Sequence, residues 1–414
     1  MRIGIYFECQ RKSGGAYQYA LNLLEALKQN SEHQFVVFNL SADFPFSEYK
    51  LPNWQIINLI PITNGQEKKD NVTQKKFKLR RQINLLVIDF LRKFNLYKTE
   101  IFLTSLLAKK RARVFVGHNL DVIFFHSPSE MSFLTDIKTV VPIHDLHHRN
   151  HPEMKEVSGL GQFDKREYLF SNIKKHAYKI MVNSENVKRD IMKFYGTPEE
   201  KIEVIPVPAP SYIKHASEQE MEKTKKKYSL PDKFIFYPAQ FWPHKNHKNL
   251  VIALKILKDQ NFEVTAVLVG SKQELWGEFD RVQNLIKNLG LQKQVFYLGY
   301  VDNSEMSSLY GLAEALVMPT LFGYTYDVVE AWSVGCPVVY SNASDCREQV
   351  GNAALLVDSR NPADIAEKIK TILTDEKLRQ ELIENGRKKI LFQTQQHLNE
   401  KIAEIIADTE KFIG

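Results

Sequence analysis

The sequence predicts an α/β protein built from two domains that each contain a parallel sheet. Short apolar runs alternate with amphipathic, helix-length segments along most of the 414 residues, which is the pattern of repeated βαβ units. Three prolines, Pro206, Pro208 and Pro210, interrupt this alternation at mid-chain. Because proline lacks a backbone N–H and restricts the residue before it, this string cannot lie in a helix or a central strand. It therefore predicts a linker between two similar halves.

The composition is that of an ordinary soluble protein. Hydrophobic residues make up 43% of the chain and charged residues 25%, so each of two domains can bury its own core. No stretch approaches the roughly 18 consecutive apolar residues of a membrane span, and the first strand begins at the N-terminus with no signal peptide before it. Cys9, Cys336 and Cys346 have neither metal nor redox spacing. We therefore expect reduced, mostly buried cysteines in a cytoplasmic protein.

The excess of positive charge is concentrated in one segment. The net charge of the chain is +7, and residues 65–93 hold nine Lys or Arg against three acids, a balance of +6. Within this segment, residues 76–95 predict a helix with a broad apolar face flanked by basic residues. Such a helix can pack on the sheet with solvated lysines, or it can lie on an anionic membrane surface at the inner face of the membrane. Basic and aromatic residues do not interleave elsewhere, so no nucleic-acid partner is expected.

In the first half, the strand Arg2–Phe7 leads into a glycine loop at Gly14 and Gly15 and a helix at 17–30. Paired glycines let a backbone approach a ligand closely, although any tight turn could use them. Ser184 is expected to cap the helix Glu185–Tyr195. Further strands are predicted at 35–39, 54–60, 122–125, 140–143, 179–183 and 201–207.

The strand at 140–143 ends in His144 and Asp145. Ligands of doubly wound sheets lie at the carboxyl ends of strands, so both side chains are candidates to face one. His144, His147, His148 and His151 also invite a zinc interpretation. No cysteine lies nearby and the spacing is not clearly that of a helix pair, so we predict no metal.

In the second half, a strand at 234–238 is followed by the loop 239–247 and a helix that ends at Asp259. A lysine ahead of a helix N-terminus, such as Lys245, is a sound phosphate ligand. Strands are predicted at 264–270, 295–298, 315–318 and 337–340, a helix starts at Pro362, and a last helix covers 394–412.

Residues 316–358 form the most informative stretch. A buried strand ends at Pro319, Gly323 and a polar turn follow, and Glu330 heads an amphipathic run that Gly335 stops. The unpaired N–H groups of a helix N-terminus suit phosphate, and a carboxylate one turn into the helix can accept two hydrogen bonds from a ribose diol. This chemistry suits a nucleotide sugar. On these grounds Glu330→Ala should remove donor affinity and leave the melting temperature near that of the wild type.

These residues resemble the donor-binding segment of glycosyltransferase family 4, with Pro319, Gly323, Glu330-Ala331, the run Gly335-Cys336-Pro337-Val338 and the later Glu348-Gln349-Val350-Gly351. The resemblance implies the GT-B fold, which has two facing Rossmann-like domains with parallel sheets and an inter-domain cleft. It also implies an acceptor-side domain at 1–207, a donor-binding domain at 208–393, and a final helix at 394–414 that can cross back to the first domain.

The resemblance also implies roles for individual residues. Glu330 would hold the ribose, Lys245 the diphosphate, and His144 the donor sugar or the acceptor; these three are the predicted catalytic residues. Asp145 and His148 are predicted on the acceptor side. The predicted donor-binding residues are Gly14, Gly15, Gln240, Lys245, Gly270, Val301, Gly323, Tyr324, Thr325 and Glu330. The chain departs from the family where Phe322 replaces a glutamate, Thr325 a glycine and Gln240 an arginine.

The expected activity is transfer of a sugar from a UDP- or GDP-sugar to a glycan, lipid-linked or protein acceptor. The resemblance implies retention of the anomeric configuration. We expect no cofactor, and no metal because the sequence contains no Asp-x-Asp pair between apolar strands. Two alternatives stay open. One is a glycosyltransferase-like accessory subunit with weak or no catalysis, and the other is a non-hydrolysing sugar-nucleotide epimerase of the same fold.

Overall fold

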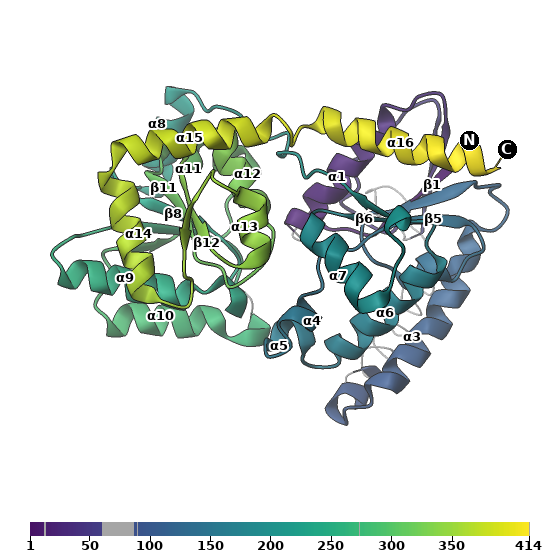
Figure 1. Cartoon of the computed structure of the whole chain (residues 1–414), viewed down its shortest axis with the longest axis horizontal. Helices are drawn as coiled ribbons and strands as arrows, with labels where there is room; N and C mark the ends of the chain where they lie inside the picture. The colour runs from purple at the N-terminus through teal and green to yellow at the C-terminus, as the bar shows by residue number, and fades with distance from the viewer. Residues whose placement is uncertain (12–13, 60–86, 89, 273, 414) are drawn as a thin grey trace, which may run out of the picture. The chain divides into compact units, whose positions relative to one another are not determined.

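The computed structural model describes residues 1–11, 14–59, 87–88, 90–272 and 274–413. The chain divides into two compact units (Figure 1). Unit 1 consists of Met1–Ile205 and Asn399–Gly414, and unit 2 consists of Pro206–Leu398. Unit 2 thus begins at the first proline of the mid-chain string, where a continuing strand is not possible.

Unit 1 is built on a parallel sheet of seven strands in the order β3-β2-β1-β4-β5-β6-β7. The central strands β1, β4 and β5 are buried except for the first residues of β1 and β5, as expected for a sheet covered on both faces. The strands are β1 (Arg2–Phe7), β2 (Gln34–Asn39), β3 (Trp54–Asn58), β4 (Val122–Phe125), β5 (Lys138–Pro142), β6 (Lys179–Val182) and β7 (Ile202–Val204).

The helices of unit 1 are α1 (Gly15–Lys28), α3 (Tyr97–Ala112), α4 (His147–Asn150), α5 (Lys155–Ser158), α6 (Gln162–His176), α7 (Glu185–Tyr195) and α16 (Gln395–Ile413), with 3₁₀ turns η2 (Arg113–Phe115), η3 (Glu130–Phe133) and η4 (Glu199–Lys201). As predicted, Ser184 caps α7, since its hydroxyl oxygen accepts from the N–H of Val187 at 3.2 Å.

The helix α16 packs at the amino ends of the unit 1 strands (Figure 1). The hydroxyl of Tyr178, just before β6, donates to the carbonyl of Asp408 at 3.1 Å. The ammonium of Lys138, at the start of β5, lies 4.8 Å from the ring centroid of Phe412. The carboxyl ends of the strands lie at the opposite edge of the sheet.

Unit 2 has a parallel sheet of six strands in the order β10-β9-β8-β11-β12-β13. The strands are β8 (Ile235–Pro238), β9 (Ala266–Val269), β10 (Val295–Tyr297), β11 (Ala315–Met318), β12 (Val338–Ser341) and β13 (Leu355–Val357). The helices are α8 (Glu218–Tyr228), α9 (His247–Asp259), α10 (Glu278–Asn288), α11 (Asn303–Leu312), α12 (Tyr326–Ser333), α13 (Ser344–Val350), α14 (Pro362–Thr374) and α15 (Glu376–Ile390), with 3₁₀ turns η5 (Pro243–Lys245) and η6 (Glu274–Trp276).

Each sheet has one point at which the strand order reverses direction. In unit 1 this point lies between β1 and β4, and in unit 2 it lies between β8 and β11. Loops that leave neighbouring strands in opposite directions open a crevice at the carboxyl edge, which is where ligands of such sheets bind. The fold therefore marks one candidate location in each unit.

Several predicted elements differ from the observed ones. The helix α12 begins at Tyr326, so Glu330 lies in the body of this helix instead of at its head. The cause is Thr325, whose hydroxyl oxygen accepts from the N–H of Asp327 and starts the helix earlier. Of the helix predicted at 76–95, residues 76–86 and 89 lie outside the described residues. None of the helices that the structure describes is long and apolar enough to cross a membrane.

Candidate active site

In unit 2, the loops that follow β8 and β11 are joined by hydrogen bonds at the point where the strand order reverses. The side-chain amide of Asn246 donates to the carbonyl of Pro319 at 2.9 Å. The backbone N–H of Leu321 donates to the carbonyl of His244 at 2.8 Å. The two loops therefore form one rigid rim that carries Lys245 on one side and the N-terminus of α12 on the other.

Lys245 ends η5, immediately before α9. Burial raises the pKa of Asp327, and the positive charge of Lys245 opposes this rise. The ammonium group of Lys245 therefore lies close enough to act on the first turn of α12, where Asp327 is located. A cation beside two helix N-termini is a suitable environment for a phosphate group.

Glu330 is buried, with 4% of its surface exposed. The hydroxyl of Tyr212 donates to one of its carboxylate oxygens at 2.6 Å, and the hydroxyl of Tyr310 donates to the other at 2.9 Å. Burial, together with the nearby carboxylate of Asp327, raises the pKa of Glu330. Each carboxylate oxygen has two lone pairs and accepts one tyrosine hydroxyl, so each retains the capacity for one more donor.

Phe322 stands where the resembled family carries its first glutamate, and its side chain lies in the interior. It is 1% exposed, and its ring stacks on that of His244 with centroids 4.8 Å apart and an interplanar angle of 12°. The position is thus part of the packing between the β8 and β11 loops. A carboxylate at this place would be buried against an aromatic ring.

The turn from β11 into α12 is braced by residues of β12 and α13. The N–H of Gly323 donates to the carboxylate of Asp345 at 2.7 Å, and its carbonyl accepts from the hydroxyl of Tyr340 at 2.6 Å. The side-chain amide of Gln349 both accepts from the N–H of Thr325 at 3.2 Å and donates to its carbonyl at 2.6 Å. The hydroxyl of Tyr324 accepts from the side chain of Gln393 at 3.1 Å. The backbone entering α12 is therefore held firmly.

The remaining predicted donor-binding residues of unit 2 lie in the adjoining loops. Gly270 has a φ of +143°, and a Cβ atom there would lie 2.4 Å from the carbonyl oxygen of Ala239. Only glycine allows this approach between the loops that follow β8 and β9. The side-chain oxygen of Gln240 accepts from the indole N–H of Trp242 at 2.9 Å. Val301 is buried at 3% exposure.

In unit 1, Gly14 precedes α1 with a φ of 59° and a ψ of −122°, a conformation that only glycine adopts readily, and Gly15 is the first residue of the helix. His144, just beyond β5, packs edge-to-face against Tyr19 with ring centroids 4.7 Å apart. Burial lowers the pKa of His144, which favours the neutral imidazole. A neutral imidazole can accept a hydrogen bond as well as donate one.

Asp145 and His148 are held by other side chains. Burial alone would raise the pKa of Asp145, but His147 and the ion-paired Arg166 outweigh it and hold the pKa far below the usual range. His148 is fully buried, and its Nε2 lies 2.8 Å from a carboxylate oxygen of Glu167. His148 therefore links α4 to α6 through Glu167, and the acceptor contact predicted for it from the sequence stays a prediction. Within the described residues, no three His, Cys, Asp or Glu side chains converge as metal ligands would.

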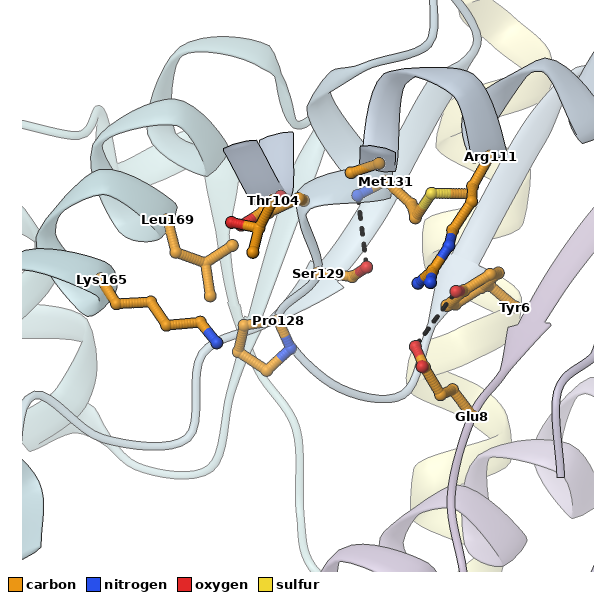
Figure 2. Close-up of a pocket in the computed structure, with 11 residues that line it drawn as sticks. Tyr6, Glu8, Thr104, Arg111, Pro128, Ser129, Met131, Lys165 and Leu169 are labelled. Atoms are coloured by element: carbon orange, nitrogen blue, oxygen red, sulfur yellow. Dashed lines mark hydrogen bonds between the residues drawn. The ribbon is translucent and has the colours of Figure 1, made fainter. Parts of the chain in front are cut away.

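Unit 1 also contains a cavity of about 270 Å³ that sequence reasoning did not find. It lies beyond the carboxyl ends of β1 and β4, at the point where the strand order of unit 1 reverses. Figure 2 shows Lys165 and Leu169 of α6 on one side of it and Arg111 of α3 with the Tyr6–Glu8 pair on the other. Its lining consists of Tyr6, Glu8, Thr104, Ala108, Arg111, Pro128, Ser129, Glu130, Met131, Lys165 and Leu169.

The cavity combines charges of both signs with apolar walls. The hydroxyl of Tyr6 donates to the carboxylate of Glu8 at 3.0 Å. Burial raises the pKa of Glu130, and Lys165, Thr104 and Arg111 each oppose the rise, so these groups lie around its carboxylate. Convergent polar and charged groups beside apolar walls can fix the orientation of a small molecule that binds there.

Comparison with known proteins accounts for both units. Residues 13–209 match the family described as "Glycosyltransferase Family 4", and residues 218–389 match "Glycosyl transferases group 1". The chain is 24% identical over 256 residues to a serotype-specific mannosyltransferase WbdA of Escherichia coli, covering 59% of this chain and 30% of that protein. It is 27% identical over 203 residues to the O-antigen chain mannosyltransferase B of Escherichia coli, covering 49% and 53%. The chain thus spans about half or less of these relatives.

Solved structures agree in fold. A glycosyltransferase from Rickettsia africae superposes with a TM-score of 0.70 at 19% identity, covering 99% of this chain and 98% of the other. Anabaena HepE in complex with UDP and glucose gives a TM-score of 0.69 at 18% identity, covering 99% and 100%. Two matching family descriptions that cover most of the chain, and two parallel sheets shared with solved glycosyltransferases, lead to one conclusion: the chain has the GT-B fold and belongs to glycosyltransferase family 4.

Proposed function

We propose that this glycosyltransferase transfers a hexose from a UDP- or GDP-sugar held by unit 2, with retention of the anomeric configuration and without a metal ion. The observation that carries the proposal is the rim of unit 2, where Lys245 and the N-terminus of α12 lie on joined loops beside Glu330. The names of two relatives, which are mannosyltransferases, support a hexose. The UDP bound to HepE supports a nucleotide donor.

In this proposal the ribose and the diphosphate of the nucleotide sugar each have a chemically suitable partner. The free acceptor capacity of Glu330 takes the ribose hydroxyls, as the family resemblance implies, and Tyr212 and Tyr310 fix its orientation. The diphosphate lies against Lys245 and the N–H groups at the start of α12. Since Gln240 replaces the arginine of the family, these N–H groups would carry more of the phosphate charge.

We expect front-face substitution at the anomeric carbon. The bond from this carbon to the diphosphate oxygen breaks, the bond to the acceptor oxygen forms on the same face, and the acceptor proton passes to the leaving diphosphate. In this proposal Glu330 holds the ribose and Asp327 accepts from the hydroxyl of Thr325, so neither is assigned the role of a covalent nucleophile. Lys245 would stabilise the charge that builds on the diphosphate, and this function needs no metal.

The acceptor is proposed to be a glycan or a lipid-linked sugar bound by unit 1, with His144 contacting the acceptor or the donor sugar and Asp145 holding the turn that follows. The cavity at the reversal point of the unit 1 sheet supports this assignment, because it combines hydroxyl, carboxylate and cationic groups at the edge where ligands bind. A cytoplasmic location at the inner face of the membrane would suit such an acceptor.

A second candidate function is an accessory subunit that keeps the fold and turns over no substrate. The buried Phe322 favours it, because the family's first carboxylate is missing from the rim. The two candidates differ in whether donor binding leads to a product.

The test begins with nucleotide sugars screened by calorimetry, followed by mass spectrometry of the product and NMR of its anomeric configuration. Lys245→Ala should lower turnover about 100-fold with a smaller loss of donor affinity, because charge on the diphosphate grows in the transition state. Lys248→Ala, an exposed lysine in the first turn of α9, is the matched control. Equal losses of affinity and turnover would limit Lys245 to binding. Donor binding without any product would favour the accessory subunit.

A further inference from the structure

The helix α3 has two functional faces. Thr104, Ala108 and Arg111 lie four and three residues apart, so they share one face, and this face lines the cavity of unit 1. The other face is exposed although it carries large apolar side chains. Phe102 is 62% exposed and Leu106 is 51% exposed, with Leu103 and Leu107 beside them. We call Phe102, Leu103, Leu106 and Leu107 the outer face of α3.

Large exposed apolar side chains are also frequent in the segment that precedes the helix. Val87, Phe90, Phe94 and Leu96 are also exposed, and the rings of Phe90 and Phe94 lie 4.8 Å apart. Nine of the fifteen large apolar residues that are exposed in the described part of the chain fall between residues 87 and 116. Isolated exposed apolar residues are normal, but a concentration of this kind marks a contact surface.

The charges that border this surface have one sign. Lys98, Lys109, Lys110 and Arg113 are exposed on α3 and the turn that follows it. The single acid of the helix, Glu100, is 7% exposed and is neutralised by two bonds from Arg92, at 2.7 and 3.0 Å. Among the described residues of α3, every charged side chain that is exposed is therefore positive.

A lipid surface with anionic headgroups complements this combination better than a protein does. Protein interfaces are depleted in lysine, whereas interfacial helices place Phe and Leu on one side and Lys or Arg at its border. A symmetric contact between the outer faces of two copies would bring two sets of exposed lysines and arginines into one interface, with no exposed acid of α3 to pair with them. Such like-charge contacts are unfavourable.

We propose that the outer face of α3 inserts into the headgroup region of an anionic bilayer. Phe102, Leu103, Leu106 and Leu107 would enter the boundary between headgroups and acyl chains, and Lys109 and Lys110 would contact anionic headgroups. The opposite face of the same helix lines the cavity, so a sugar linked to a membrane lipid would be presented next to it. This inference rests on the proposed function only for the nature of the acceptor.

The first experiment measures sedimentation of the full chain with vesicles. Wild type should bind vesicles of phosphatidylcholine containing about one-third phosphatidylglycerol, bind pure phosphatidylcholine weakly, and lose affinity as salt rises. Lys109→Gln with Lys110→Gln should weaken binding about 30-fold, the effect of two lysines near an anionic surface. Phe102→Ser with Leu106→Ser should weaken it at least 10-fold even at low salt.

Matched controls exist in unit 2. Leu391→Ser with Phe392→Ser removes two apolar residues of 71% and 69% exposure. Lys287→Gln with Lys293→Gln removes two exposed lysines. Neither pair should change vesicle binding. The proposal is overturned if wild type does not sediment with anionic vesicles at low salt, or if the controls lower binding as much as the α3 substitutions.

The second experiment tests whether the outer face of α3 itself enters the lipid. Cys9, Cys336 and Cys346 are buried, so Leu106→Cys can be labelled selectively with an environment-sensitive fluorophore. Its emission should shift to the blue only when anionic vesicles are added, and Leu391→Cys should not respond. A shift that follows protein concentration without lipid would indicate a second copy, and a blue-shifted emission under all conditions would indicate cover by residues 60–86. Either result refutes the proposal.

Both experiments are independent of catalysis. Donor affinity, measured by calorimetry, should be the same in wild type and in all α3 variants, because their positions lie outside unit 2. Vesicle binding without any turnover would support the membrane-binding proposal and contradict the proposed function. Turnover of a soluble acceptor by a chain that does not bind vesicles would support the proposed function and contradict the membrane-binding proposal.

Discussion

At the scale of single residues, the position of Glu330 between two tyrosine hydroxyls determines how its role can be tested. Glu330→Ala would leave the hydroxyls of Tyr212 and Tyr310 without their acceptor in a buried place. We expect a loss of about 2–4 kcal/mol in the free energy of unfolding. The unchanged melting temperature that the sequence suggests for this variant is therefore no longer expected.

Glu330→Gln separates binding from stability. A glutamine side chain offers an oxygen to one tyrosine and an N–H to the other, so the melting temperature should stay within a few degrees of wild type. Donor affinity should fall at least 10-fold, because the charge that accepts from the ribose hydroxyls is lost. Calorimetry with the nucleoside diphosphate measures this fall. An unchanged affinity in a folded variant would remove Glu330 from the donor site.

Phe322 gives a second prediction at this scale. Phe322→Glu restores the family residue but places a carboxylate in a site that is 1% exposed and stacked on His244. We expect the free energy of unfolding to fall by about 3 kcal/mol or more, with no gain in turnover. Urea unfolding checks the first expectation, and Phe322→Leu serves as the apolar control. A stable Phe322→Glu variant with higher turnover would show that this position faces the donor sugar.

Sequence motifs identify some of these residues and miss others for a physical reason. Gly323, Glu330 and Lys245 belong to local patterns with a recognisable spacing. Tyr212 and Tyr310 reach Glu330 from positions 118 and 20 residues away, and no local pattern records such a contact. The contact between His148 and Glu167 could not be predicted either, because spacing does not reveal which side chain a histidine ring meets.

At the scale of elements, the loops around the unit 2 rim depend on the close approach of Gly270 to Ala239. Gly270→Ala would place a Cβ atom 2.4 Å from the Ala239 carbonyl oxygen and would force a φ of +143° on alanine. The loop that carries Lys245 must then move. We expect a loss of stability of about 2 kcal/mol or more, and at least a 10-fold loss of donor affinity.

Gly290→Ala is the matched control for this substitution. Gly290 also has a positive φ, +65°, but a Cβ atom there meets nothing within 4 Å. Its replacement should cost only about 1 kcal/mol of backbone strain and should leave donor affinity unchanged. Thermal unfolding measures the stability of both variants, and calorimetry measures their donor affinity. Equal donor affinities in the two variants would show that the approach to Ala239 does not position the rim.

A helix can be predicted from its sequence when its large apolar residues face the core. The helix α7 has a clear apolar stripe and a serine cap, and its predicted bounds are confirmed. The helix α3 was not predicted, because its buried residues are only Glu100, Ala108 and Ala112 and its large apolar residues face outward. A pattern that assumes apolar residues point inward cannot identify such a helix.

At the scale of the whole molecule, the α/β fold with two parallel sheets predicted from the sequence is confirmed. Alternating apolar runs and helices require parallel strands, and the prolines at 206–210 separate the two halves. The order of the strands was not predictable from these patterns, because it depends on which strands pair across long crossovers. The cavity of unit 1 depends on that order and therefore could not be predicted from the sequence patterns.

The chain end contributes to the stability of unit 1. Ile402 on α16 is fully buried, and α16 from Asn399 onward belongs with unit 1. Ile402→Ala should lower the free energy of unfolding of unit 1 by about 2–5 kcal/mol through the cavity it leaves. Hydrogen exchange followed by mass spectrometry should show faster exchange in β1 and β4 and no change in β11 and β12. Lys411→Ala, at an exposed position of the same helix, should change neither, and equal acceleration in both units would contradict the assignment.

The contact between Tyr178 and Asp408 joins residues 230 positions apart, and this separation has a consequence for biosynthesis. All of Pro206–Leu398 is translated before the part of α16 that belongs to unit 1, from Asn399 onward, and this takes roughly ten to forty seconds at typical elongation rates. During this interval the nascent chain holds an N-terminal sheet whose amino edge still lacks its covering helix. Unit 2 is contiguous and can finish folding first. The half of the protein that leaves the ribosome first is therefore the last to be completed.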